Sequence, residues 1–241
     1  MKLPDIIRTE MNGAIDNDYA VFQRRLTPTA YKIEGIRVPV LRGIAKNAGD
    51  EGRAAILAAT EFCSFEEVLV YGFAAGYIED TDELKEKIDF MLPLFDNWAH
   101  VDTITSSLKT IKKHRAEFLK KYEPLKNAEA VFARRFLAVM LLDHYMNDEY
   151  SGRVLDIYRE ITPGDYYVDT AVAWGLSVLI IKRRDETLAS LVRGDFTPLT
   201  TGKAVQKAIE SCRVSDEDKR FLRGFRSGIK ALNGQKYPEI P

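Results

Sequence analysis

Apolar residues recur along this chain with the period of an α-helix. Phe65, Leu69, Gly72, Phe73 and Gly76 follow the spacing i, i+4, i+7, i+8 and i+11, which places them on one face of a helix. The segment from Val131 to Leu142 repeats this spacing. No run alternates between apolar and polar residues as a half-buried strand would. The pattern therefore predicts an all-α protein.

The predicted helices recur at a regular interval. Helix-starting signals precede several of them, at Ser64, at Thr162–Asp165 and at Ser215. Strongly apolar helices are expected to begin near Phe65, Trp98, Ala130, Tyr166 and Lys203, roughly 35 residues apart. Each interval holds a second, more amphipathic helix, expected over residues 82–95, 115–125, 150–161 and 186–192. Without a Gly/Pro-rich linker, this arrangement predicts one stack of about six helical hairpins spanning residues 1–241.

Composition limits the class of protein to which this predicted stack can belong. The chain has 241 residues, of which 46% are hydrophobic, enough for one sizeable core or an elongated repeat array. No apolar run reaches the roughly 18 residues of a membrane helix, and the first residues lack the apolar stretch of a signal peptide. We therefore expect a cytoplasmic protein with no membrane segment. Cys63 and Cys212 are far apart in sequence, which favours two buried free thiols over a disulfide or zinc site.

Charge gives a weaker signal, because the formal net charge is −1. The distribution is uneven: residues 181–241 hold 13 Lys or Arg and 8 Asp or Glu. A second basic cluster runs from Lys109 to Lys121. Such clusters form either a solvated helix face or a nucleic-acid surface, and both interpretations stay open.

Candidate chemistry gathers around the two tryptophans of the chain. Trp98 and Asp102 are four residues apart and would lie one above the other on a helix. An indole beside a carboxylate attracts a cation through the ring quadrupole and the full negative charge. Arg135 follows Trp98 by 37 residues and Trp174 follows Arg135 by 39, so the three would share one concave face of a repeat stack. The alternatives are core tryptophans, and an Asp102 that pairs with Arg135.

Four further cations are candidate contacts to a nucleic-acid backbone. Arg37 and Arg42 flank Pro39 at an expected helix start, and Lys203 and Lys207 lie one helical turn apart. Each is either a phosphate contact or part of an exposed, salt-bridged surface. His100 and His144 have no second histidine at a metal-binding spacing, so no metal site is expected.

Several segments together carry a resemblance to a known family. They are Gly35–Arg42, Asp96-Asn97-Trp98 with Asp102, Arg135-Phe136, Tyr166–Trp174 and Lys203–Ala208. In this order and at this spacing, the chain resembles the AlkD-like DNA alkylation repair family of HEAT-like repeat proteins. The resemblance covers most of the chain and implies a right-handed α-α superhelix.

The resemblance also implies a function. Family members remove N3- and N7-alkylated purines from double-stranded DNA by hydrolysing the N-glycosidic bond, without a cofactor. Carried over, Asp102 is the catalytic carboxylate, Trp98 and Trp174 are aromatic walls around the deoxyribose, and Arg135 holds the DNA backbone. An alkylated purine is already cationic, so it leaves easily and the carboxylate stabilises the positive sugar that remains. We expect the protein to act as a monomer.

The chain also departs from the family pattern. Leu26–Thr29 interrupts a helix where family members can carry a DNA-contacting helix, and Phe132 stands where active members commonly have tryptophan. These departures leave two alternatives to the glycosylase. One is a non-catalytic HEAT-like module that binds nucleic acid or protein, and the other is a hydrolase unrelated to DNA.

Overall fold

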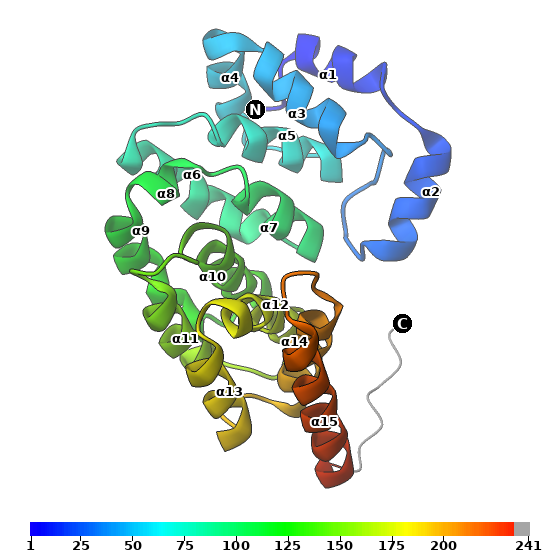
Figure 1. Ribbon diagram of the computed structural model, residues 1–241. Helices are drawn as coiled ribbons and strands as arrows, with labels where there is room; N and C mark the ends of the chain where they lie inside the picture. Colours follow the sequence, from blue (N-terminus) through cyan, green and yellow to red (C-terminus); the bar gives the residue numbers. More distant parts are fainter. Residues whose placement is uncertain (234–241) are drawn as a thin grey trace. The chain divides into compact units, whose positions relative to one another are not determined.

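The protein is helical throughout the part described by the computed structural model, residues 1–233, with side chains for residues 1–227. Fifteen α-helices and two short 3-10 helices occupy these residues (Figure 1). The β structure in this range is a single parallel bridge between Lys32 and Ser64. The predicted all-α, helical-repeat class is therefore confirmed.

The chain divides into two compact units, Met1–Lys121 and Tyr122–Pro241. The helices of the first unit are α1 (Asp5–Asn12), α2 (Asn17–Leu26), α3 (Val38–Asn47), α4 (Gly49–Leu57), α5 (Phe65–Ala75), α6 (Thr81–Met91), η1 (Leu92–Leu94), α7 (Trp98–Thr105), α8 (Thr110–Lys113) and α9 (Arg115–Tyr122).

Helices α1, α3, α5 and α7 of the first unit pack in sequence, each against the next, and α4 and α6 also pack on α5 (Figure 1). Every residue of α5 is buried, because neighbours contact it on several sides. A Cβ on Gly72 would lie 2.5 Å from the Ile104 side chain of α7. Small residues on α5 therefore let α7 approach closely.

The second unit repeats this arrangement. Its helices are η2 (Glu123–Asn127), α10 (Val131–His144), α11 (Ser151–Glu160), α12 (Tyr166–Lys182), α13 (Arg184–Arg193), α14 (Pro198–Glu210) and α15 (Asp216–Asn233). Helices α10, α12, α14 and α15 pack one on the next, and α11 and α13 pack on α12.

Tyr158 of α11 joins three helices of the second unit. Its hydroxyl donates a hydrogen bond to the Ala138 carbonyl of α10, 3.0 Å away. A Cβ on Gly175 of α12 would lie 2.1 Å from the same hydroxyl. The glycine beside Trp174 thus leaves the space that this buried tyrosine fills.

Most expected helix starts agree with the structure. The starts expected near Phe65, Trp98, Ala130 and Tyr166 correspond to α5, α7, α10 and α12. The fifth expected start, Lys203, falls inside α14. This helix begins earlier because the Thr197 side chain accepts a hydrogen bond from the Thr200 amide. The amphipathic helices match α6, α9, α11 and α13.

Division into two units does not test the expectation of one domain over residues 1–241. Repeat arrays are held by contacts between neighbouring repeats, so they separate into compact parts wherever they are divided. The expectation stays a prediction, and residues 234–241 lie outside the described range.

The expectation of buried cysteines is wrong. Both Cys63 and Cys212 are unpaired, as expected, but exposed. Each lies in a connection rather than a helix, Cys63 just before Ser64, the N-cap of α5, and Cys212 after the end of α14. Connections run over the surface, so neither thiol reaches the core.

None of the helices in the described residues is long and apolar enough to span a membrane. Within the same residues, no group of three His, Cys, Asp or Glu side chains could hold a metal ion.

Candidate functional site

The start of α7 is fixed by Asn97, a fully buried residue. Its side-chain oxygen accepts a hydrogen bond from the His100 amide at 2.9 Å, which caps the helix. Its side-chain nitrogen donates to Asp96 Oδ1 at 2.6 Å and to His100 Nδ1 at 2.9 Å. The residue before Trp98 is therefore held at both ends of its amide group.

Trp98 is the first residue of α7, and a distant segment orients its ring. The indole N–H donates to the Leu26 carbonyl at the end of α2, 3.0 Å away. The same segment is held by Asp96 Oδ2, which accepts from the Thr29 hydroxyl and the Ala30 amide, each at 2.7 Å. The segment that interrupts the N-terminal helices is thus a support for Trp98. Sequence spacing gave no signal for these contacts, because their partners are 66 to 72 residues apart.

Asp102 lies one turn after Trp98 on α7. Residues four apart on a helix share a face, and both side chains are partly exposed. The two residues therefore lie on one face of α7, as their spacing predicts. The roles of the two residues in a reaction stay predictions.

His100 packs inside the first unit. Its ring stacks on Phe65 with centroids 4.5 Å apart, and its Nε2 lies 3.0 Å from the Phe65 carbonyl. Burial lowers the pKa of His100 to about 4. Since Nδ1 faces the Asn97 amide N–H, the ring is neutral, with its proton on Nε2. The carboxylate of Asp96, 3.6 Å from Nδ1, does not form an ion pair with a neutral ring.

Arg37 and Arg42 both have protein partners in the first unit. Arg37 forms an exposed ion pair with Asp16 at 3.2 Å, and its guanidinium carbon lies 4.3 Å from the centre of the Tyr19 ring. Arg42 Nη2 donates to the Thr103 carbonyl at 3.0 Å, which ties α3 to the end of α7. Burial lowers the pKa of Arg42 below its usual value. Neither arginine is an isolated surface cation.

Arg135 is buried between two helices of the second unit. Its guanidinium donates to the Tyr167 carbonyl and to the Thr170 hydroxyl, 3.4 Å away in the latter case. Phe132, one turn earlier on α10, places its ring 5.6 Å from that of Tyr167. Arg135 thus fixes α10 to the first turn of α12, and its expected contact with the DNA backbone stays a prediction.

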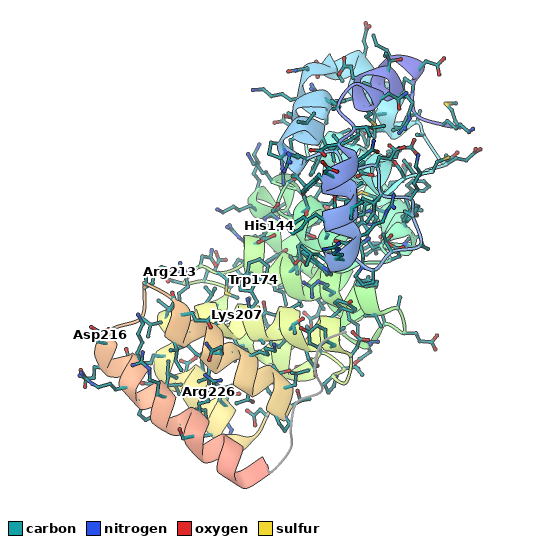
Figure 2. The ribbon with its side chains drawn as sticks, turned by 90° about the vertical axis from the view of Figure 1, so that its right-hand side faces the viewer. His144, Trp174, Lys207, Arg213, Asp216 and Arg226 are labelled. Atoms are coloured by element: carbon teal, nitrogen blue, oxygen red, sulfur yellow. The ribbon has the colours of Figure 1, made fainter. Side chains whose placement is uncertain are left out.

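Each candidate lysine of α14 lies near an aromatic ring of α12. Trp174 is 38% exposed, and Lys207 Nζ lies 5.6 Å from the centre of its ring (Figure 2). Lys203 Nζ lies 5.9 Å from the centre of the Tyr166 ring. Each lysine is within cation–π range, so the second unit presents paired aromatic and basic groups. Whether Trp98, Arg135 and Trp174 share one surface stays a prediction.

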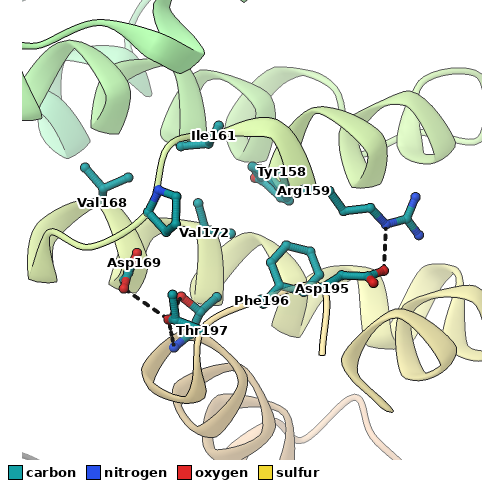
Figure 3. A pocket seen from close by; sticks show the side chains of 11 residues that line it. Tyr158, Arg159, Ile161, Val168, Asp169, Val172, Asp195, Phe196 and Thr197 are labelled. Carbon is teal, nitrogen blue, oxygen red and sulfur yellow. Dashed lines mark hydrogen bonds and ion pairs between the residues drawn. The ribbon is translucent and has the colours of Figure 1, made fainter. Parts of the chain in front are cut away.

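A small cavity in the second unit lies beside Asp169 (Figure 3). Its carboxylate accepts hydrogen bonds from the Thr197 hydroxyl at 3.1 Å and the Gly164 amide at 3.3 Å. Burial raises the pKa of Asp169 above its usual range. The cavity measures about 40 Å³, space on the order of a single water molecule. It is too small for a nucleobase.

All eight candidate residues lie within the range matched by one protein family. The sequence model of the family described as DNA alkylation repair enzyme matches residues 7–207. The chain belongs to this family. The resemblance inferred from the sequence is thereby confirmed, and membership supports a role in DNA alkylation repair. No curated protein matches the chain.

Helix α15 begins beyond the matched range, at Asp216. It packs against α14, and its Asp218 forms an ion pair with Arg184 at 2.6 Å. The candidate site of the alkylation repair protein therefore belongs to the family portion, while α15 covers the last matched helix.

Proposed function

We propose that the protein is a DNA glycosylase that excises cationic N3- and N7-alkylated purines from duplex DNA. The observation that supports this most directly is that Trp98 and Asp102 lie on one face of α7, in a chain that belongs to the alkylation repair family. The hydrogen bonds of Asn97 fix the start of α7, and the bond to the Leu26 carbonyl orients Trp98.

The proposed chemistry needs little from the protein besides negative charge and shape. Alkylation at N3 or N7 makes the purine cationic, so the base leaves without a strong acid. The glycosidic bond electrons depart with the base, and the sugar becomes an oxocarbenium ion. In the proposal, the Asp102 carboxylate stabilises that ion and positions the water that attacks C1′. An indole face adds cation–π attraction of about 1–2 kcal/mol in a dry site.

The second unit would supply the remaining contacts. Trp174 is proposed as a further aromatic wall for the deoxyribose, and Arg135 as a group near the backbone. Lys203 and Lys207 are proposed phosphate contacts. Support for these assignments comes from the family membership, from the exposure of Trp174 and from the basic groups beside it.

Release of the modified base tests the proposal. Purified protein is incubated in excess with duplex DNA that carries N7-methylguanine or N3-methyladenine, and the free base is quantified by chromatography. We expect release above the spontaneous rate. Release equal to that of a protein-free control, at saturating protein, would reject the glycosylase.

One observation favours the second candidate, a non-catalytic module that binds nucleic acid or protein. Helix α2 carries two arginines in its last turn, but Arg24 donates to the Ile33 carbonyl at 3.0 Å. In α1, Arg8 is bound to Glu34 at 2.6 Å. Of the three arginines of α1 and α2, Arg8 is thus neutralised by a carboxylate and Arg24 is tied to a carbonyl, which reduces the number of cations available to DNA. Duplex binding without base release would support this candidate.

A further inference from the structure

A groove in the first unit carries only positive charge. It has a volume of about 470 Å³ and is formed by α3 and by the ends of α5 and α7 with the turn after it. Its charged lining consists of Arg42, Lys46 and Lys109, and no carboxylate lines it. The net charge of the chain is −1. A groove lined by three cations and no carboxylate is therefore a local concentration of positive charge.

The sequence builds this groove from one face of α3. Pro39, Arg42, Gly43 and Lys46 follow the spacing i, i+3, i+4 and i+7, so they line the same side of the helix. A Cβ on Gly43 would meet no atom within 4 Å, which shows open space at this position. The small glycine and the buried Phe73 form the recessed part of the groove.

Arg42 contributes a fixed charge. Its guanidinium carbon lies 4.3 Å from the centre of the Phe73 ring, and it donates to Ser107 Oγ at 2.5 Å and Ser106 Oγ at 3.3 Å. These contacts, with the bond to the Thr103 carbonyl, hold the group in one orientation. The positive charge that Arg42 brings to the groove is therefore preorganised.

Lys46 and Lys109 are the adaptable cations. Both are exposed, and among the described side chains neither has a carboxylate within ion-pair distance. The Ser106 and Ser107 hydroxyls on the same lining already donate to the Thr103 carbonyl, so the hydroxyl left for a ligand is that of Tyr77. Lysine ammonium and hydroxyl groups are the side chains that commonly hold phosphate oxygens in protein–DNA interfaces.

We propose that this groove binds the phosphodiester backbone of duplex DNA, with Lys46 and Lys109 as phosphate ligands and Arg42 as a fixed positive charge. The inference rests on the proposed action on DNA. The groove volume corresponds to about fifteen water molecules. This is more than one phosphate ion needs, which favours several phosphates of one DNA strand. Its role is to hold the strand, independent of base sequence and separate from the chemistry at Asp102.

The test compares two double variants with equal charge. Lys46→Gln/Lys109→Gln removes the two groove lysines, and Lys2→Gln/Lys182→Gln removes two exposed lysines elsewhere. Affinity for an unmodified duplex is measured at several salt concentrations. Each lost phosphate contact lowers the slope of log K against log salt by about 0.9. We expect the groove variant to lose about 1.8 in slope and to bind roughly 50-fold more weakly at 0.1 M salt.

The control variant should keep the wild-type slope. Equal losses in both variants, or no loss in the groove variant, would overturn the groove as a DNA site. A duplex slope that stays unchanged while binding of inorganic phosphate is lost would also overturn it, in favour of a small-anion site. Unmodified DNA is not a substrate, so the result does not depend on excision. The DNA-binding test of the groove can therefore fail while base release is observed, and base release can fail while the groove variant loses DNA affinity.

Discussion

Asp102 and Trp98 should act at different moments of the proposed reaction. The full charge of the Asp102 carboxylate matters only once the sugar becomes cationic, whereas an indole also packs against the neutral sugar of the bound substrate. Groups that bind the transition state more strongly than the ground state raise the rate of the chemical step. Substitutions at the two positions should therefore separate rate from affinity.

Asp102→Asn keeps the shape of the side chain and removes its charge. We expect the single-turnover excision rate to fall by about 10²–10³, with DNA affinity nearly unchanged. Trp98→Ala should weaken both quantities, which makes it the comparison variant. Single-turnover excision and equilibrium binding are measured on the same methylated duplex. Wild-type excision by Asp102→Asn would remove the carboxylate from the mechanism.

His100 should make stability depend on pH. Its pKa is about 4 in the folded protein against 6.5 for the ordinary side chain, so the unfolded chain binds the proton more readily. The stabilisation of the fold by the neutral His100 ring is complete above the pKa of the unfolded chain. It is lost as the pH falls toward the pKa of His100 in the folded protein. Between pH 7.5 and 5 this loss amounts to about 2 kcal/mol.

Urea unfolding at these two pH values measures the effect. Between these pH values, the free energy of unfolding of His100→Gln should fall by about 2 kcal/mol less than that of the wild type. The variant is nevertheless less stable at pH 7.5, because it lacks the stacked ring. His114→Gln, at an exposed position after α8, should keep the wild-type dependence. An identical pH dependence in wild type and His100→Gln would show that the imidazole does not titrate as described.

The connection before α3 combines a turn, a buried charge and a close approach. Gly35 has a φ of +83°. The Glu66 carboxylate accepts hydrogen bonds from the amides of Glu34, Gly35 and Ile36, of which the Gly35 bond is 2.7 Å long. Successive amides that converge on one anion form a favourable site for it. Burial nevertheless raises the pKa of Glu66, against the effect of these bonds.

Gly35→Ala should destabilise the first unit for two reasons. Alanine is strained at positive φ by about 1 kcal/mol, and its Cβ would lie 2.1 Å from the Asp16 carbonyl oxygen at the start of α2. Moving that backbone adds about 1–3 kcal/mol. Gly49→Ala is the matched control, since Gly49 also has positive φ but its Cβ would meet no atom within 4 Å.

Urea midpoints of the two variants are compared with wild type. We expect Gly35→Ala to lose about 2–4 kcal/mol and Gly49→Ala about 1 kcal/mol. Equal losses would mean that the approach of α2 to Gly35 contributes nothing.

Helices were predictable from sequence because their causes are local. The run from Tyr166 to Lys182 is almost wholly apolar at its centre, since α10, α11, α13 and α14 all contact it, and Asp165 caps it as the sequence indicated. That Trp98 and Asp102 lie on one face of α7 follows from helical spacing alone. The bond from Trp98 to Leu26 could not be predicted, because it depends on how α2 folds back across 72 residues.

At the scale of the whole molecule, charge should decide how strongly the protein binds DNA. The net charge of −1 gives no general attraction, so binding depends on local cations such as Lys46, Lys109, Lys203 and Lys207. Four phosphate contacts on duplex DNA correspond to a slope of about −3.6 in log K against log salt.

We expect duplex affinity to fall by roughly 100-fold between 50 mM and 200 mM salt. Fluorescence anisotropy with a labelled unmodified duplex measures this, at constant pH. A fall of less than about 5-fold would be too small for four phosphate contacts. Single-stranded DNA of the same length should show a shallower slope.

The ties between α7 and the N-terminal segment also bear on the order of events during synthesis. Leu26 leaves the ribosome 72 residues before Trp98, and Thr29 leaves it 67 residues before Asp96. At about 5–20 residues per second, the end of α2 waits roughly 4–14 s for its contact with Trp98. Phe22, 56% exposed even in the finished fold, is accessible to chaperones throughout that interval. The contact between the end of the second helix and α7 is therefore absent for seconds after that helix is made.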